Sequence, residues 1–88
     1  MLEGKIALVT GASRGIGRAI SDMLGAQGAS IIGTATSEAG ATAISQRFAD
    51  AGLKGEGMRL DVSDDASVEA VVKQISETYG PVGILVNN

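Results

Sequence analysis

The stretch V-T-G-A-S-R-G-I-G-R-A-I, from Val9 to Ile20, holds three glycines within seven residues: Gly11, Gly15 and Gly17. Glycine is unfavourable inside regular structure, so such a cluster marks a sharp turn or a place where another group approaches the backbone closely. An apolar run precedes the cluster and a helical pattern follows it. We therefore interpret the stretch as strand, glycine-rich turn and helix, which directs backbone N–H groups and a helix N-terminus at a phosphate.

The spacing of the glycines assigns a separate role to each. Gly11 lets the chain leave the strand tightly, Gly15 lets the backbone approach a diphosphate, and Gly17 lets the helix pack close to the sheet. The pattern is Gly-x-x-x-Gly-x-Gly without the Gly-Lys-Ser/Thr ending of a P-loop, which argues against an NTPase. The alternative is a turn that only packs tightly. The position of the cluster, between the first strand and an amphipathic helix, favours the ligand site.

Composition limits the class of protein. The 88 residues suffice for one small domain or for part of a larger one. Apolar residues make up 44% of the chain and aromatic residues 2%, which suits a buried parallel sheet under helices. The chain holds no cysteine and no histidine. This excludes a disulfide framework and removes the commonest metal ligands, so we expect no metal site.

Charge and hydropathy argue against two kinds of partner. The net charge of −3 argues against non-specific binding to nucleic acid. No apolar stretch approaches the ~20 residues of a membrane span. The first residues also lack the basic and apolar regions of a signal peptide. We therefore expect a soluble, cytoplasmic protein that binds neither nucleic acid nor membrane.

Hydrophobic periodicity predicts alternating strands and helices. The strands are expected over residues 5–10, 30–34, 58–61 and 84–87. The helices are expected to begin after the glycine turn, at Ser37, and at Ser63 or Asp64, and to end near Gly28, Gly52 and Gly80. Their predicted buried faces are Ile16, Ala19, Ile20, Met23 and Leu24; Ala41, Ile44, Phe48 and Ala51; and Val68, Val71, Val72, Ile75 and Tyr79.

This order of elements predicts an α/β fold of the Rossmann type, a doubly wound parallel sheet. Right-handed crossovers place the four strands in the order 3-2-1-4, with the three helices on both faces. The fourth strand then has an open, apolar edge, which is a pairing liability for a free-standing domain. We therefore expect residues 1–88 to be incomplete, as the N-terminal part of a single nucleotide-binding domain.

The segment after the second strand indicates which dinucleotide is bound. In such folds an acid ~20 residues beyond the glycines binds the ribose 2′-hydroxyl, whereas an arginine accepts a 2′-phosphate. Residues 33–37 offer hydroxyl groups and no acid, while Arg14 stands in the glycine loop. Arg14 and Thr36 together favour NADPH. The alternatives are that Arg14 is a solvated surface residue and that Glu38, the nearest acid, repels the phosphate.

Asp61 and Val62 follow the third predicted strand, where they would face the adenine. The carboxylate can accept the adenine amino group while Val62 packs against the ring. An equally good interpretation is that Asp61 only begins the turn before Ser63.

These segments together resemble the short-chain dehydrogenase/reductase family. The stretch T-G-A-S-R-G-I-G matches its cofactor motif, Asp61-Val62 its adenine-site pair, and Asn87-Asn88 the start of its Asn-Asn-Ala-Gly motif. Within the family, G-T-A-T-S-E after the second strand is similar to the bacterial 3-oxoacyl-(acyl-carrier-protein) reductases of fatty-acid biosynthesis. One departure is Gly83, because family members usually carry an acid just before this last strand.

The resemblance implies NADPH-dependent reduction of a 3-oxoacyl thioester on acyl-carrier protein by a cytoplasmic homotetramer. It also implies that Asn88 approaches the ribose and the nicotinamide, and that Ile16 and the residues from Gly11 to Arg14 line the diphosphate and adenosine side. The complete set of predicted cofactor-binding residues is Gly11, Ala12, Ser13, Arg14, Gly15, Ile16, Gly17, Thr36, Asp61, Val62 and Asn88.

The family's catalytic Ser, Tyr and Lys lie beyond residue 88, so we expect no catalytic residue in this chain. Tyr79 is the only tyrosine, and a Tyr-x-x-x-Lys pair would need lysine at position 83, where glycine stands. We therefore predict that Tyr79 is a core residue. Two alternatives stay open: a reductase acting on another ketone or alcohol, and a non-catalytic NADP-binding module if the chain ends at Asn88.

Overall fold

The computed structural model describes residues 2–12, 15–61 and 63–86. Within these residues the chain alternates between strands and helices, as the hydrophobic pattern predicts. The elements are β1 (Ile6–Val9), α1 (Gly15–Ala26), β2 (Ser30–Ala35), α2 (Glu38–Ala51), β3 (Lys54–Arg59), α3 (Asp65–Thr78) and β4 (Ile84–Val86).

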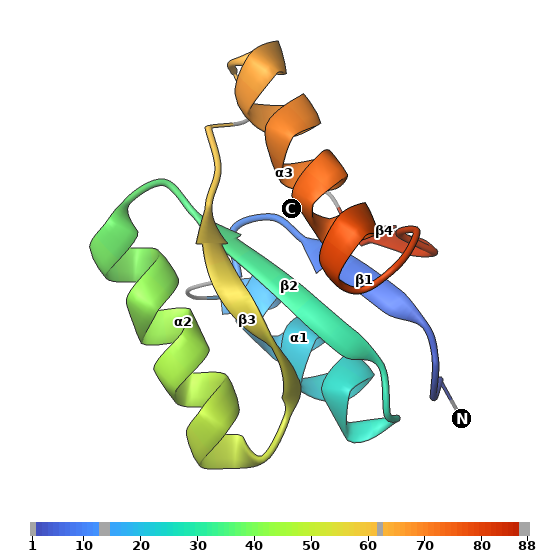
Figure 1. The fold of residues 1–88 in the computed structure, drawn as a ribbon. Helices are drawn as coiled ribbons and strands as arrows, with labels where there is room; N and C mark the ends of the chain where they lie inside the picture. The colour runs from blue at the N-terminus through green and yellow to red at the C-terminus, as the bar shows by residue number, and fades with distance from the viewer. Residues whose placement is uncertain (1, 13–14, 62, 87–88) are drawn as a thin grey trace.

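The described strands form one parallel sheet in the order β3-β2-β1-β4 (Figure 1). The register pairs Ile6 with Ser30, Ala7 with Ile84, and Ser30 with Lys54. This confirms the predicted α/β class and the predicted strand order. Because every strand runs the same way, all their carboxyl ends lie at one edge of the sheet.

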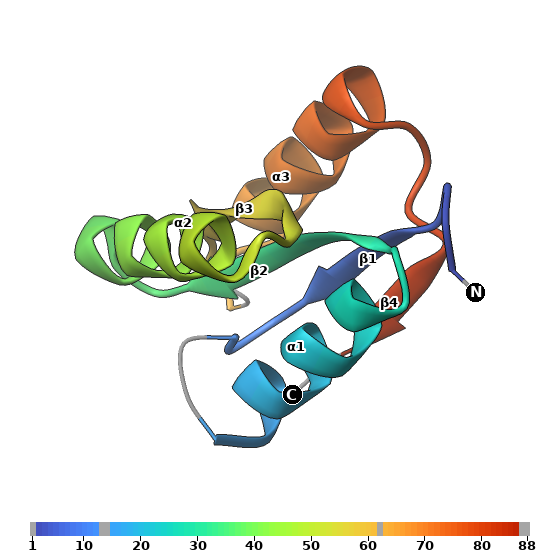
Figure 2. The same ribbon diagram turned by 90° about the horizontal axis from the view of Figure 1, so that it is seen from below.

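The helices cover both faces of the sheet, with α1 and α2 on one face and α3 on the other (Figure 2). Each face has its own apolar core. The first core comprises Ala7, Val9, Ala12, Leu24, Ala29, Ile31, Ala35, Ile44 and Phe48. The second comprises Ile6, Leu8, Ile32, Leu60, Val71 and Ile75. In the described part of the chain, no helix is long and apolar enough to cross a membrane.

Two helices begin at the capping residues that the sequence predicts. The Ser37 side chain accepts a hydrogen bond from the Gly40 N–H at 3.0 Å, which caps α2. For α3, the cap is Asp64 rather than Ser63, because its carboxylate accepts from the N–H groups of Ala66 and Ser67. These caps satisfy N–H groups that have no partner within the helix.

The third strand lies earlier in the sequence than predicted, at Lys54–Arg59 instead of residues 58–61. Its first residues are polar and rich in glycine, so they show no strand-like pattern. The glycines are needed because other backbone atoms approach closely. A Cβ on Gly57 would lie 2.1 Å from the Ala41 carbonyl oxygen of α2, and one on Gly55 would lie 1.8 Å from the Ile31 oxygen of β2.

The predicted buried face of α1 is wrong in part. The helix buries Gly17, Ser21 and Leu24, while Ile16 is 70% exposed and Met23 is 55% exposed. Small residues let α1 approach the sheet closely, and the Ser21 hydroxyl is satisfied inside the interface by donating to the Gly17 carbonyl oxygen at 2.8 Å. Ala19 on α1, Ala51 on α2 and Val72 on α3 are likewise exposed rather than buried.

Candidate cofactor site

The predicted site residues that the structure describes gather at the carboxyl edge of the sheet. Gly11 and Ala12 follow β1, Thr36 follows β2, and Asp61 lies two residues after β3. In open α/β sheets this edge is where ligands bind. The fold therefore brings together three segments that are far apart in the sequence.

Two glycines of the turn adopt a backbone conformation that favours glycine. Gly11 and Gly15 both have φ of +63°, a value that side chains with a Cβ rarely adopt. A Cβ added at Gly15 would meet nothing within 4 Å, so the start of α1 faces open space. Gly17 is buried against the rest of the fold.

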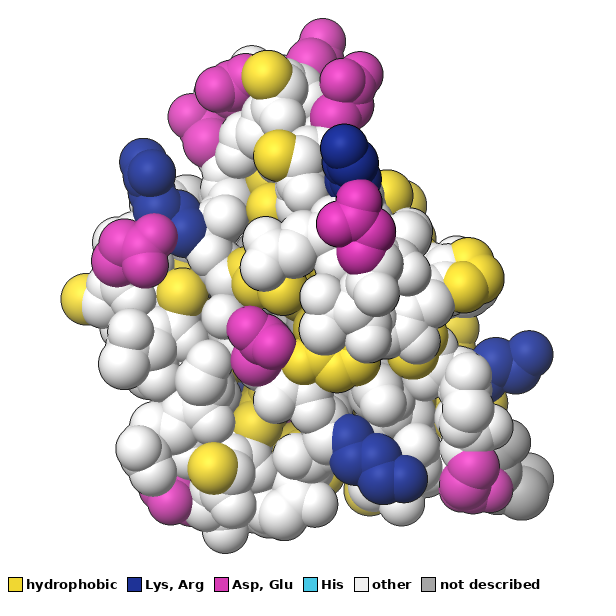
Figure 3. Space-filling model, viewed as in Figure 1, with side chains coloured by type: hydrophobic (Ala, Val, Ile, Leu, Met, Phe, Trp, Pro, Cys, Tyr) yellow, Lys and Arg dark blue, Asp and Glu magenta, His cyan; other side chains and the backbone are white. Residues whose placement is uncertain are grey.

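The first turn of α1 is suited to an anion. It carries no acidic residue, whereas α2 and α3 carry Glu38 and Asp65 in their first turns. The N-terminus of a helix bears a partial positive charge and unpaired N–H groups, which favour a phosphate. Figure 3 shows acidic side chains gathered over the start of α3, where Asp64, Asp65 and Glu69 are exposed. The start of α1 therefore fits a diphosphate better than the start of either other helix.

Ile16 and Thr36 are both accessible at this edge. Ile16 lies at the start of α1 with 70% of its surface exposed, and Thr36 is exposed directly after β2. The Arg59 Nε donates a hydrogen bond to the Thr36 carbonyl oxygen at 3.3 Å. This contact brings a positive charge to the residue that we predict to bind a 2′-phosphate.

A hollow of about 310 Å³ lies between α2, β3 and α3. Its lining includes Glu38 and Arg59 together with the polar Thr42, Ser45 and Gln74. Glu38 and Arg59 carry opposite charges, so the electric field of each is partly cancelled by that of the other. The repulsion that Glu38 would exert on a phosphate near Thr36 is therefore reduced by Arg59.

Asp61 forms the turn that one of the two sequence interpretations predicts. Its Oδ1 accepts hydrogen bonds from the Ser63 hydroxyl at 2.6 Å and from the Ser63 N–H at 3.0 Å. These bonds hold the pKa of the Asp61 carboxyl below its ordinary value of 3.8, with a smaller contribution from Arg59. The carboxylate is exposed and ionised, so the turn also presents a hydrogen-bond acceptor at the carboxyl edge.

Four predicted site residues lie outside the described residues: Ser13, Arg14, Val62 and Asn88. Their proposed roles rest on the sequence. Among residues 2–12, 15–61 and 63–86, no three acidic side chains gather closely enough to hold a metal ion.

Tyr79, at the end of α3, connects this helix to β3 by a hydrogen bond. Its hydroxyl donates a hydrogen bond to Glu56 Oε2 of β3 at 2.5 Å. Partial burial and the neighbouring carboxylate raise the pKa of Tyr79 to about 12. The ring packs against the core on the α3 face, which agrees with the predicted structural role.

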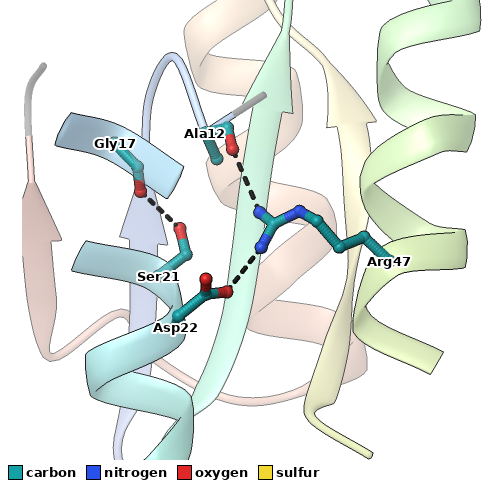
Figure 4. A network of polar contacts seen from close by, with 5 residues as sticks. All are labelled: Ala12, Gly17, Ser21, Asp22 and Arg47. Atoms are coloured by element: carbon teal, nitrogen blue, oxygen red, sulfur yellow. Dashed lines mark hydrogen bonds and ion pairs between the residues drawn. The ribbon is translucent and has the colours of Figure 1, made fainter. Parts of the chain in front are cut away.

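The sequence interpretation missed Arg47, which bonds to the glycine turn (Figure 4). Helical spacing was a signal for Arg47, because this residue stands three positions after the buried Ile44 and next to the buried Phe48. An arginine at the border of a buried helical face can cover apolar surface and still reach a polar partner.

A strand, a glycine turn and a helix, at the carboxyl edge of a parallel sheet, define a dinucleotide-binding fold of the Rossmann type. The family model of the short chain dehydrogenases matches residues 5–88. The chain therefore belongs to the short-chain dehydrogenase family, whose members are oxidoreductases.

Several curated bacterial proteins are similar to almost the whole chain. The 3-oxoacyl-(acyl-carrier-protein) reductase FabG of Escherichia coli (strain K12) is 60% identical over 98% of the chain. The proteins of the same name from Vibrio harveyi and Pseudomonas aeruginosa are 59% and 53% identical, each over 99% of the chain. The chain spans 34 to 35% of the length of these relatives.

Proposed function

We propose that the intact protein is an NADPH-dependent 3-oxoacyl-(acyl-carrier-protein) reductase of fatty-acid biosynthesis. The observation that carries the proposal is the 60% identity to a relative of that name over 98% of the chain. That span includes the three segments that meet at the carboxyl edge of the sheet. An exposed α1 N-terminus without an acid in its first turn supports a diphosphate-binding role.

We assign each part of the cofactor to particular residues. The backbone from Gly11 to Gly17 holds the diphosphate, and Arg14 with Thr36 binds the 2′-phosphate. Asp61 and Val62 hold the adenine, with the Asp61 carboxylate accepting from its amino group. Asn88 stands on the ribose and nicotinamide side.

The proposed reaction forms a C–H bond at the ketone carbon and an O–H bond at its oxygen. When bound, the reduced nicotinamide supplies the hydride. The alkoxide oxygen must then receive a proton from an acid. Asp61 is unsuited to this, because its pKa is lowered and its carboxyl is ionised. Tyr79 holds its proton in the bond to Glu56. We therefore propose that the proton donor is contributed by residues beyond position 88.

The extent of the domain and the assembly follow from the same proposal. We infer that residues 1–88 form part of a single larger NADP-binding domain, since they span 34% of the E. coli relative. Apolar side chains on its surface, Leu85 of β4 at 65% exposure and Met23 of α1 at 55%, are available for further packing. We propose a cytoplasmic homotetramer. Light scattering of the purified intact protein tests the number of subunits directly.

The experiment that tests the proposed activity is NADPH oxidation by the intact protein with a 3-oxoacyl-(acyl-carrier-protein) substrate. We expect turnover with NADPH, much less with NADH, and a 3-hydroxyacyl product identified by mass spectrometry. Turnover of other ketones but not of the acyl thioester would assign a different substrate. Cofactor binding without turnover of any ketone would instead identify a non-catalytic NADP-binding module.

A further inference from the structure

Arg47 of α2 is held in a defined position beside the glycine turn (Figure 4). Its guanidinium lies over the ring of Phe48, with Cζ 5.2 Å from the ring centroid, and Phe48 itself is fully buried. Only 19% of the Arg47 side chain is exposed. A guanidinium that is stacked and largely covered keeps its direction better than a solvated one.

The two terminal nitrogens of Arg47 reach two different elements. Nη2 donates to the Ala12 carbonyl oxygen at 3.1 Å, and Nη1 donates to Asp22 Oδ1 of α1 at 2.5 Å. Asp22 is half exposed, so solvent weakens that ion pair. The bond to Ala12 is partly buried and is therefore the more important of the two for the turn.

Ala12 is held by both its backbone and its side chain. Its N–H donates to the Thr34 carbonyl oxygen of β2 at 3.0 Å, and its side chain is fully buried. A Cβ at Gly33 would lie 2.8 Å from the Ala12 Cβ, so β2 is already in close contact with the turn. With Arg47 on the carbonyl, both polar groups of Ala12 are bonded. A peptide group is planar, so holding its oxygen fixes the direction of the backbone at that point.

We propose that Arg47 is a positioning residue for the dinucleotide site, acting through the Ala12 carbonyl on the turn that binds the diphosphate. This inference rests on the proposed function, because it presumes that the glycine turn binds NADPH. Arg47 directs its guanidinium at the protein, not at the ligand. Its effect therefore falls on the diphosphate side of the site, which NADPH and NADH share, and does not depend on the 2′-phosphate.

The test compares Arg47→Ala with the wild type in the intact protein, using NADPH and NADH as the probes. We expect the dissociation constants of both cofactors to rise by the same factor, about 2–30-fold. The KM for NADPH should rise with them while kcat stays close to the wild-type value. Asp22→Asn, which keeps the Ala12 bond, should give a smaller rise than Arg47→Ala.

Two matched variants separate positioning from stability. Gln46→Ala changes the neighbouring residue of α2, whose side-chain amide donates to Asp50 Oδ1 at 2.9 Å on the exposed side of the helix, and it should leave both dissociation constants unchanged. Tyr79→Phe lowers stability on the α3 face of the sheet, so it shows how far a general loss of stability changes affinity. If Arg47→Ala does not fold, Arg47→Lys serves instead. Its ammonium lacks the planar fork of arginine and donates from one nitrogen, so it holds Ala12 and Asp22 less well and should raise both dissociation constants by a smaller factor than the alanine variant.

The possible outcomes distinguish the positioning role of Arg47 from the proposed function. If the wild type binds NADPH and the Arg47 variants bind both cofactors as tightly, the positioning role is overturned and the proposed function stands. A loss for NADPH alone would also overturn it, because Arg47 would then contact the 2′-phosphate. If the wild type binds neither cofactor, the proposed function fails and this inference fails with it.

Discussion

At the scale of single residues, we propose that Arg14 and Thr36 determine which cofactor is bound. NADPH differs from NADH by one phosphate, so selectivity depends on the few groups that meet that phosphate. Thr36 is exposed after β2, and Arg59 donates a hydrogen bond to its carbonyl oxygen. The segment between Gly33 and Ser37 offers no acid that would bind a ribose 2′-hydroxyl instead.

Replacing Arg14 with alanine should therefore weaken NADPH binding selectively. A charge-assisted hydrogen bond contributes about 1.5–3 kcal/mol, so the dissociation constant for NADPH should rise roughly 10–150-fold. The constant for NADH should stay nearly unchanged, and calorimetric titration of both cofactors measures this. The matched control is Arg18→Ala, which changes an exposed arginine of α1 four residues further along the chain. An equal loss for both cofactors would refute the assignment of Arg14.

At the scale of elements, close backbone contact decides how α2 lies on β3. A Cβ at Gly57 would lie 2.1 Å from the Ala41 carbonyl oxygen and 2.8 Å from the Ile44 Cβ. The Gly57 N–H also donates to the Ser45 hydroxyl of α2 at 2.8 Å. The helix can occupy this position only because the strand has no side chain there.

Gly57→Ala should therefore destabilise the intact protein by about 1–3 kcal/mol or more, because α2 must shift to admit the methyl group. Thermal unfolding followed by circular dichroism measures the effect. In the control Gly83→Ala, the new Cβ would find its nearest contact 4.0 Å away at the Ile6 carbonyl oxygen. That variant should be neutral or stabilised by about 0.4–1 kcal/mol. Equal unfolding temperatures for the two variants would contradict this packing.

The bond between Tyr79 and Glu56 makes the α3–β3 contact depend on pH. The pKa of Tyr79 is raised from 10.0 to about 12, so its contribution to folding is complete below pH 10 and is lost as the pH rises through 12. Tyr79→Phe should lower stability by about 0.5–1.5 kcal/mol near neutral pH. The difference in unfolding temperature between wild type and variant should then shrink between pH 10 and 12. A difference that stays constant over that interval would show that the bond from the protonated hydroxyl to Glu56 is not its source.

The sequence predicts elements well where burial follows a simple period. The apolar runs of β1 and β2 and the caps at Ser37 and Asp64 are such cases. It fails at residues 54–57 of β3, where polar residues and glycines of an edge strand show no hydrophobic pattern. It fails again on α1, where Gly17 and Ser21 are buried because they are small. Both errors arise from close backbone approach, which hydropathy does not record.

Some residues of the candidate site can likewise be predicted from the sequence, and others cannot. The glycine turn, Thr36 and Asp61 can be predicted because each lies directly in a motif or near a strand end. Helical spacing places Arg47 at the border of a buried face but does not identify its partner, because its bond to Ala12 joins residues 35 positions apart. Only the packing of α2 on the sheet brings the two together.

At the scale of the whole molecule, the parallel sheet brings the segments of the candidate site together. Segments separated by up to 50 positions, from Gly11 to Asp61, meet at one edge because all described strands run the same way. The first turn of α1 at that edge has no acid, while the exposed acids Asp64, Asp65 and Glu69 lie at or near the start of α3. The shape and the charge of this edge therefore both support the proposed site for an anionic dinucleotide.

The most direct test of this central claim is hydrogen–deuterium exchange of the intact protein with and without NADPH, read by mass spectrometry. We expect slower exchange in peptides covering residues 10–17, 36–38 and 61–63. We expect no change in the peptide covering residues 73–78, at the C-terminal end of α3. Slower exchange confined to residues outside the carboxyl edge, or no change anywhere at saturating NADPH, would contradict cofactor binding at this edge.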